Sequence, residues 1–169
     1  MRSEKDQSSK GQLGQQFVCP SWLCPTFDNI FRRWLQSPES ILGQYIKQGW
    51  TVLDVGPGKG YFTIPLARLV GVSGKVIAAD LQKKMLDGIY HRALRAGMQD
   101  RITLHQCAPD NIGVGDPIDF CLAFWMVHEV PDRSRFLGEI ASGLKPAGLL
   151  LLGNPGCMFP GKSSEIQFA

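Results

Sequence analysis

Three glycines, Gly56, Gly58 and Gly60, stand at alternating positions directly after a short apolar run that contains Asp54. Glycine at such positions lets the backbone turn tightly and lets a ligand approach the main chain closely. A dinucleotide loop of the G-x-G-x-x-G type would need a glycine at position 61, where this chain has Tyr61. The Asp54 carboxylate beside the loop also disfavours a pyrophosphate, so the pattern favours a ligand that carries positive charge.

A second acidic residue, Asp80, ends the next apolar run, 20 residues after Gly60. A carboxylate at that place can accept hydrogen bonds from both hydroxyls of an adenosine ribose. NAD-dependent enzymes use the same device, and Asp80 could also cap a helix that begins near Gln82. S-adenosylmethionine contains an adenosine, a sulfonium and an ammonium but no phosphate, so it suits both acidic residues better than NAD does. An NAD-dependent oxidoreductase remains the weaker alternative.

His128 and Glu129 follow a third apolar run, 118–124, and are candidates for a general base or for orienting a substrate. Methyl transfer from a sulfonium is an in-line displacement that needs alignment and, for some acceptors, a proton acceptor, so no fixed catalytic motif is required. The alternative is that His128 packs or bonds to the backbone while Glu129 and Asp132 help to start the next helix.

Apolar runs alternate with helical periodicity from residue 50 onward. The pattern predicts strands at 50–55, 75–80, 102–106, 118–124 and 149–152, and helices at 61–70, 82–96 and 132–144. The helix at 82–96 is expected to bury Met85, Leu86, Ile89, Tyr90, Ala93 and Leu94 and to end at Gly97. This alternation predicts an α/β fold with a Rossmann-like parallel sheet, helices on both faces, and ligands at the carboxyl ends of the strands.

Three parts of the chain are expected. Residues 1–16 are polar and predict a flexible tail, 17–49 predict a helical lid, and 50–169 predict the cofactor-binding core. Within the lid, one helical stripe runs from Phe27 to Leu35, and a second helix starts with Ser37 as cap and Pro38 at its first position, with Ile41, Leu42, Tyr45 and Ile46 as its stripe. Cys19, Trp22 and Cys24 could line an acceptor pocket, for a thiophilic acceptor such as arsenite among others, or could simply pack on the sheet.

Composition narrows the partners. The chain has 169 residues, a net charge of +3 and scattered basic residues, which predicts one soluble domain without a nucleic-acid surface. No run is long enough to span a membrane and no signal-type segment opens the sequence, so a cytoplasmic location is expected. The five cysteines are odd in number and lack metal-site spacing, which predicts reduced thiols and no metal.

Residues 40–155 resemble the class I S-adenosylmethionine-dependent methyltransferases, and within them the type 11 and ubiquinone/menaquinone-biosynthesis-like enzymes. Val52–Gly60 resembles the first motif of that family, Val76–Asp80 its second, and Leu144–Gly148 the turn into its fifth strand. The resemblance implies methyl transfer from S-adenosylmethionine to a small-molecule acceptor.

The resemblance also implies roles for individual residues. Asp54, Gly56, Pro57, Gly58 and Gly60 would hold the methionine part of the cofactor, Asp80 the ribose, and Leu81 one face of the adenine. Cys107–Asn111 would border the adenine, with Asp110 the candidate for its amino group, and Phe124 with Trp125 would border the cofactor on its other side.

The family usually continues past the fifth strand with a helix and an antiparallel pair, whereas residues 153–169 hold room for a loop and a turn of helix. The expectation is therefore a sheet without the C-terminal antiparallel strands, in which the fifth strand is an open edge. A homodimer, a fragment or a truncated product would each account for such an edge. A cofactor-binding but catalytically silent module that acts through a partner on this edge is the second functional alternative.

Overall fold

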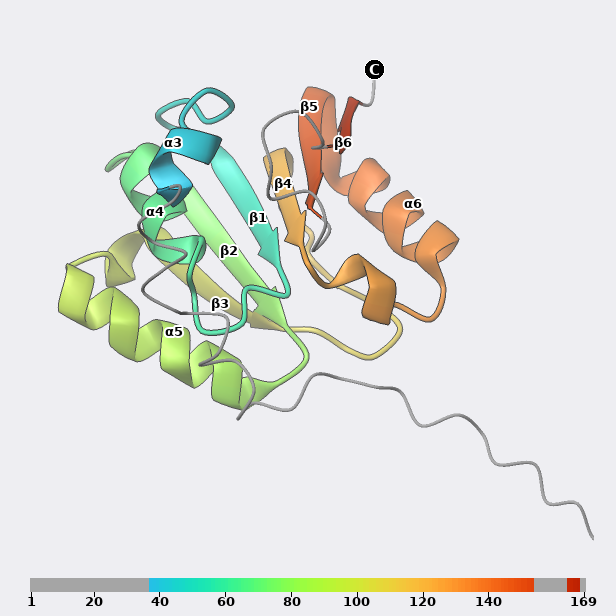
Figure 1. The fold of residues 1–169 in the computed structure, drawn as a ribbon, viewed down its shortest axis with the longest axis horizontal. Coiled ribbons are helices and arrows are strands. Elements are labelled where there is room, and N and C mark those ends of the chain that lie inside the picture. The colour runs from blue at the N-terminus through green and yellow to red at the C-terminus, as the bar shows by residue number, and fades with distance from the viewer. Residues whose placement is uncertain (1–36, 154–163, 168–169) are drawn as a thin grey trace, which may run out of the picture.

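The computed structural model describes residues 37–153 and 164–167 (Figure 1). One sheet has the strand order β3-β2-β1-β4-β5-β6. Its strands are β1 (Thr51–Val55), β2 (Lys75–Asp80), β3 (Ile102–Gln106), β4 (Ile118–Phe124), β5 (Leu144–Gly153) and β6 (Ser164–Gln167). β1 to β5 pair in parallel, which confirms the predicted α/β fold.

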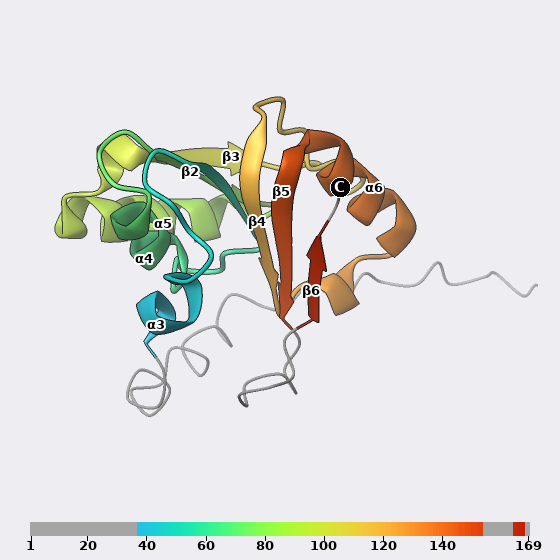
Figure 2. The ribbon, with the colours of Figure 1, turned by 90° about the horizontal axis from the view of Figure 1, so that it is seen from above.

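Helices cover both faces of this sheet. The helices are α3 (Pro38–Leu42), α4 (Thr63–Leu69), α5 (Lys83–Ala96) and α6 (Arg133–Gly143), with 3-10 turns η1 (Gln99–Arg101) and η2 (Val127–Glu129). Figure 2 shows α3, α4 and α5 on one face and α6 on the other. Because the chain winds from β1 outward through β2 to β3 and then returns to β4 on the other side of β1, the winding reverses between β1 and β4. Ligands of such sheets bind at the carboxyl ends of those two strands.

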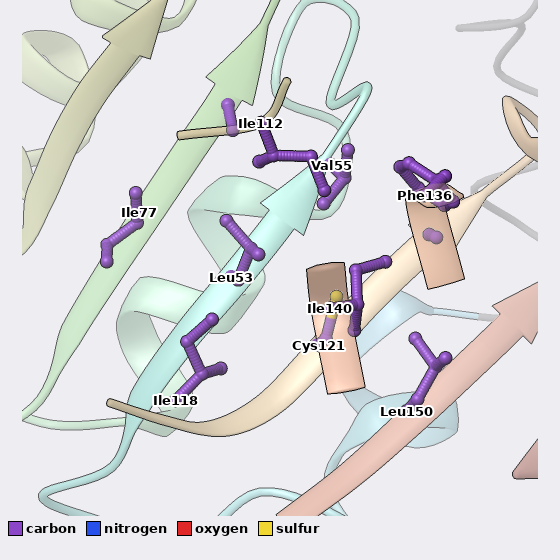
Figure 3. Packing of buried hydrophobic residues seen from close by; sticks show 11 residues of the cluster. Leu53, Val55, Ile77, Ile112, Ile118, Cys121, Phe136, Ile140 and Leu150 are labelled. Carbon is purple, nitrogen blue, oxygen red and sulfur yellow. The ribbon is translucent and has the colours of Figure 1, made fainter. Parts of the chain in front are cut away.

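Two apolar clusters hold the layers together. Alternate residues of β1 point to opposite faces, so Val52 packs in the cluster under α3 and α4 while Leu53 and Val55 pack in the cluster under α6. In Figure 3, Phe136 and Ile140 of α6 lie over this second cluster. Burial on both faces explains why the strands read as continuous apolar runs.

Local signals set several element boundaries. Ser37 caps α3 by accepting a hydrogen bond from the backbone N–H of Ser40 at 3.1 Å, and Pro38 occupies the first helical position, as predicted. Gly97 ends α5 in the left-handed conformation at φ 64°. Pro65 lies within the first turn of α4, where its missing N–H costs no helical bond.

Two features of the predicted helices are wrong. Tyr90 and Leu94 of α5 are 48% and 46% exposed, because this outer helix buries only a narrow stripe of Met85, Leu86, Ile89 and Ala93 against β2 and β3. α3 ends at Leu42, so Tyr45 and Ile46 lie beyond the helix, although both still pack on the sheet. The other lid residues, Cys19, Trp22, Cys24 and the stripe from Phe27 to Leu35 included, lie outside the described residues.

The expectation that β5 is an open edge without antiparallel strands is also wrong. β6 pairs antiparallel with β5, with Leu149 opposite Gln167 and Leu152 opposite Ser164. β5 itself starts at Leu144, five residues before the predicted strand, and its pairing with β4 shifts register where Ala147 adopts φ 62°. The sequence signal for β6 is weak because its four residues include only one apolar side chain, while backbone pairing with an exposed edge needs no particular side chains.

None of the helices in 37–153 is long and apolar enough to cross a membrane. Within the same part of the chain, no group of three or more His, Cys, Asp or Glu side chains could hold a metal ion.

Candidate functional site

The glycine loop lies at the carboxyl end of β1, as the topology requires. Gly56, Gly58 and Gly60 have φ values of 65°, 55° and 82°, a region that favours glycine. The loop is tied to β2 because the N–H of Gly56 donates to the carbonyl of Ala79 at 2.9 Å. A methyl group added at Gly58 would meet no atom within 4 Å, so the backbone there faces open space.

Gly56 needs its glycine for a second reason. A Cβ at this position would lie 2.7 Å from Cγ of Met126, the side chain that follows β4. The loop after β4 therefore packs directly on the loop after β1. This contact joins the two segments between which the winding of the sheet reverses.

Asp54 is the most deeply buried charged residue described. It is 2% exposed, and its carboxylate accepts a hydrogen bond from Thr63 Oγ1 at 2.7 Å. Burial raises the pKa of Asp54 to about 7, while the Thr63 bond lowers it and the charge of Asp80 raises it. A positive ligand group nearby would lower this pKa, because it favours the ionised carboxylate.

Asp80 ends β2 beside the glycine loop. Its carboxylate accepts a hydrogen bond from the backbone N–H of Gln82 at 2.8 Å. Gln82 itself holds the N-cap position of α5 and no side chain caps this helix, so the capping alternative for Asp80 is wrong. Burial raises the pKa of Asp80 to about 6, backbone N–H groups of Gln82 and Gly58 lower it, and the charge of Glu129 raises it. The charge of Glu129 thus acts on Asp80, and that of Asp80 on Asp54, at the carboxyl ends of the strands. Together these negative charges favour a cation.

The end of β3 adjoins Asp80. The N–H of Cys107 donates to the backbone carbonyl of Asp80 at 3.0 Å, and Gln106 Nε2 donates to the carbonyl of Leu81 at 3.2 Å. Leu81, the next residue, is 39% exposed. Asp110 lies in the following turn with a side chain that is 72% exposed, 3.6 Å from Arg135 of α6.

An aromatic group borders the other side of the loop. The ring of Phe124, the last residue of β4, lies 4.7 Å from the ring of Phe62 and 5.6 Å from that of Trp125. Trp125 adopts φ 65°, and its N–H donates to the carbonyl of Gly153 at 2.7 Å. Strained backbone of this kind is common next to functional sites.

His128 and Glu129 lie in η2, directly after this aromatic group. His128 Nε2 and Glu129 Oε1 are 3.8 Å apart, and the His128 side chain is half exposed. Asp132, and not Glu129, caps α6 by accepting from the N–H of Arg135 at 2.9 Å. Glu129 does not cap the helix, and its charge raises the pKa of Asp80 at the end of β2.

Sequence reasoning missed three residues that shape this edge: Thr63, Met126 and Glu139. Thr63 bonds to Asp54, Met126 packs on Gly56, and Glu139 binds backbone N–H groups in the loop after β3. Each acts through a contact across the fold, and none belongs to a motif. Only the strand and helix assignment, which places α4 after the glycine loop, offered a signal for Thr63.

The chain belongs to the methyltransferase domain family, whose model matches residues 52–148, more than half of the sequence. The ubiquinone/menaquinone biosynthesis C-methyltransferase of Hahella chejuensis is 32% identical over 108 residues, which cover 63% of this chain and 43% of that protein. The protein of the same name from Marinomonas sp. is 30% identical over 124 residues, 73% of this chain and 49% of that protein. The chain thus spans less than half the length of these curated relatives.

Solved structures agree with this membership. A SAM-dependent methyltransferase from Aquifex aeolicus superposes with a TM-score of 0.73 at 28% identity, covering 80% of this chain and 72% of that one. An arsenic(III) S-adenosylmethionine methyltransferase from Chlamydomonas reinhardtii superposes with a TM-score of 0.56 at 27% identity, covering 62% of this chain and 38% of that one. S-adenosylmethionine is the methyl donor of the family, which decides against the NAD-dependent alternative.

Proposed function

We propose that the chain transfers a methyl group from S-adenosylmethionine to a small-molecule acceptor at the carboxyl ends of β1, β2 and β4. The observation that carries this proposal is the buried carboxylate of Asp54 and the partly buried carboxylate of Asp80 beside a glycine loop whose backbone is open at Gly58. The family membership of residues 52–148 supports it.

The residues present fit the cofactor part by part. Open space over Gly58 admits a ligand against the main chain, and the buried charge of Asp54 favours the ammonium and sulfonium end. Asp80 accepts the ribose hydroxyls, and the exposed face of Leu81 takes the adenine. Asp110 stays a candidate for the adenine amino group, although in this structure its carboxylate is largely exposed beside Arg135.

The bound cofactor supplies an activated methyl group and its leaving group. What the chain adds is alignment, exclusion of water and a place for a proton. Phe124 and Trp125 provide apolar surface on one side of the proposed site, at the carboxyl end of β4. Next to them, His128 with Glu129 can accept a proton from an acceptor hydroxyl or carbon acid, or orient it.

Calorimetric titration tests the cofactor half of the proposal. S-adenosylmethionine and S-adenosylhomocysteine are expected to bind, and NAD is not. Asp80→Ala should weaken binding by about 1.5–3 kcal/mol, the range for hydrogen bonds to a charged group. Asp116→Ala is the matched control, because this exposed carboxylate pairs with Lys75 at the opposite ends of the strands. Tight NAD binding without a response to either sulfur compound would refute the proposal.

An acceptor screen that follows S-adenosylhomocysteine release tests turnover. The names of the curated relatives direct the screen first to precursors of ubiquinone and menaquinone, and the arsenic enzyme adds arsenite. Cofactor binding without turnover on any acceptor would instead favour the catalytically silent module. The case for that alternative is weaker than the sequence suggested, because β6 pairs with the edge of β5 on which a partner was expected.

A further inference from the structure

The loop between β3 and β4 is held by side chains from two directions. Glu139 of α6 accepts the backbone N–H of Ile112 with Oε2 at 3.1 Å and that of Gly113 with Oε1 at 2.7 Å. From the other side, His105 Nε2 lies 2.7 Å from the carbonyl oxygen of Ile112. The buried Ile112 side chain, beside Val55 in Figure 3, adds an apolar anchor. Three consecutive polar groups of the main chain are thus fixed at one point.

This fixed point lies directly after the turn that adjoins Asp80. A bridge between Ala108 and Asn111 closes the turn, so its position depends on the residue that follows it, Ile112. At its other end, the N–H of Cys107 is tied to the carbonyl of Asp80. The segment 107–111 is therefore held at both ends, by Asp80 of β2 at one end and through the Glu139 contact with Ile112 and Gly113 at the other.

α6 is a rigid base for that contact. Phe136 and Ile140, on either side of Glu139, are buried in the core beneath the helix. Bonds from two N–H groups to one ionised carboxylate are stronger than neutral hydrogen bonds. Burial raises the pKa of the Cys107 thiol to about 11, and the charges of Asp80 and then of Glu139 raise it further, so the Glu139 carboxylate lies near this segment.

We propose that Glu139 is a positioning residue that fixes the 107–111 segment against the adenine and so sets both the affinity for the cofactor and the discrimination of its base. The inference rests on the proposed function, since it needs an adenosine at Asp80. Glu139 itself does not touch the cofactor; it acts through the main chain of Ile112 and Gly113.

The test compares Glu139→Gln with Glu39→Gln. Glutamine at 139 keeps the shape but presents an amide donor to one of the two N–H groups, whereas Glu39→Gln makes the same substitution in an exposed ion pair with Arg68 on the other face of the sheet. Binding of S-adenosylhomocysteine and of S-inosylhomocysteine, which has an oxo group in place of the amino group, is measured for each protein. Glu139→Gln should bind the first about tenfold more weakly and lose preference over the second, with faster amide exchange at Ile112 and Gly113. Glu39→Gln should match the wild type.

The outcomes are distinct. A folded Glu139→Gln protein with wild-type preference and wild-type exchange at both amides would overturn the inference, and so would an equal loss in Glu39→Gln. A wild-type chain that does not bind S-adenosylhomocysteine would instead refute the proposed function. If Glu139→Gln fails to fold, His105→Ala removes the side chain that contacts the Ile112 carbonyl in the same loop, and an unchanged preference there would count against the inference in the same way.

Discussion

Replacing Asp54 by asparagine in the cofactor-free chain should change how stability depends on pH. The pKa of Asp54 is raised from 3.8 to about 7 in the folded chain, so between these values the folded state holds a proton that the unfolded state has lost. The free energy of unfolding of the wild type therefore falls as pH rises through this window and levels off above it. A shift of about 3 units corresponds to at most about 4 kcal/mol at 1.36 kcal/mol per unit.

Asparagine carries no charge at any pH, so Asp54→Asn lacks this loss. The amide can still accept the Thr63 hydroxyl with its oxygen, but its buried NH₂ costs a constant of about 1–3 kcal/mol. The informative quantity is therefore the stability of the variant minus that of the wild type, followed by urea unfolding from about pH 4 to about pH 8. We expect this difference to increase by up to about 4 kcal/mol from the low to the high end of the pH range, because only the wild type loses stability.

Asp80 has a raised pKa in both proteins, so most of its contribution cancels in the difference. Asp116→Asn, at an exposed carboxylate far from the site, should show a flat difference and serves as the control. A flat difference for Asp54→Asn as well would show that this carboxylate is not buried as a proton-binding group. It would also remove the electrostatic reason for assigning a cationic ligand to the loop.

Three further outcomes are expected. Gly56→Ala and Gly58→Ala both place a side chain at a positive φ, which costs about 1–2 kcal/mol of stability. Gly56→Ala also makes a clash with Met126, so chemical unfolding should find it less stable by about a further 1–3 kcal/mol. Gly58→Ala makes no such clash but should lose cofactor affinity in calorimetry. Leu81→Ala should leave the unfolding midpoint almost unchanged, because the side chain is exposed, yet weaken S-adenosylhomocysteine binding about tenfold; loss of stability without loss of binding would contradict its adenine role. His128→Ala should lower turnover on an identified acceptor about a hundredfold with an unchanged cofactor dissociation constant, and full turnover would return His128 to a structural role.

The fold could be predicted where one physical signal dominates. β2 and β4 occupy the predicted residues because strands buried on both faces appear as apolar runs bounded by polar residues. β3 also occupies its predicted residues, although none of the five is buried in this edge strand. The sequence pattern gave the wrong answer where burial or pairing depends on contacts with other elements. Tyr90 and Leu94 continue the apolar period of α5, but this outer helix contacts too little of the sheet to bury them. β6 is set by backbone pairing to β5, which leaves almost no pattern in the sequence.

The candidate site divides in the same way. Asp54, Asp80 and the glycines could be found because local geometry fixes them at the ends of strands, where topology brings them together. Glu139 and Met126 could not, because each meets its partner only after the two halves of the sheet have assembled. The residues proposed to bind the ligand were thus visible in the sequence, while those that hold the neighbouring segments in place required the structure.

Asp54 and Asp80 also connect stability with the choice of cofactor. Without a ligand, burial raises the pKa of both carboxyls toward neutrality, and the charge of Asp80 adds to this at Asp54 as that of Glu129 does at Asp80. A pyrophosphate would add charge of the same sign and raise the cost further, whereas a sulfonium and an ammonium neutralise it and favour the ionised carboxylates. After methyl transfer the sulfur is neutral, so the product loses part of that attraction while keeping its adenosine contacts. The same arrangement that destabilises the cofactor-free loop therefore favours binding of the charged methyl donor over retention of the product.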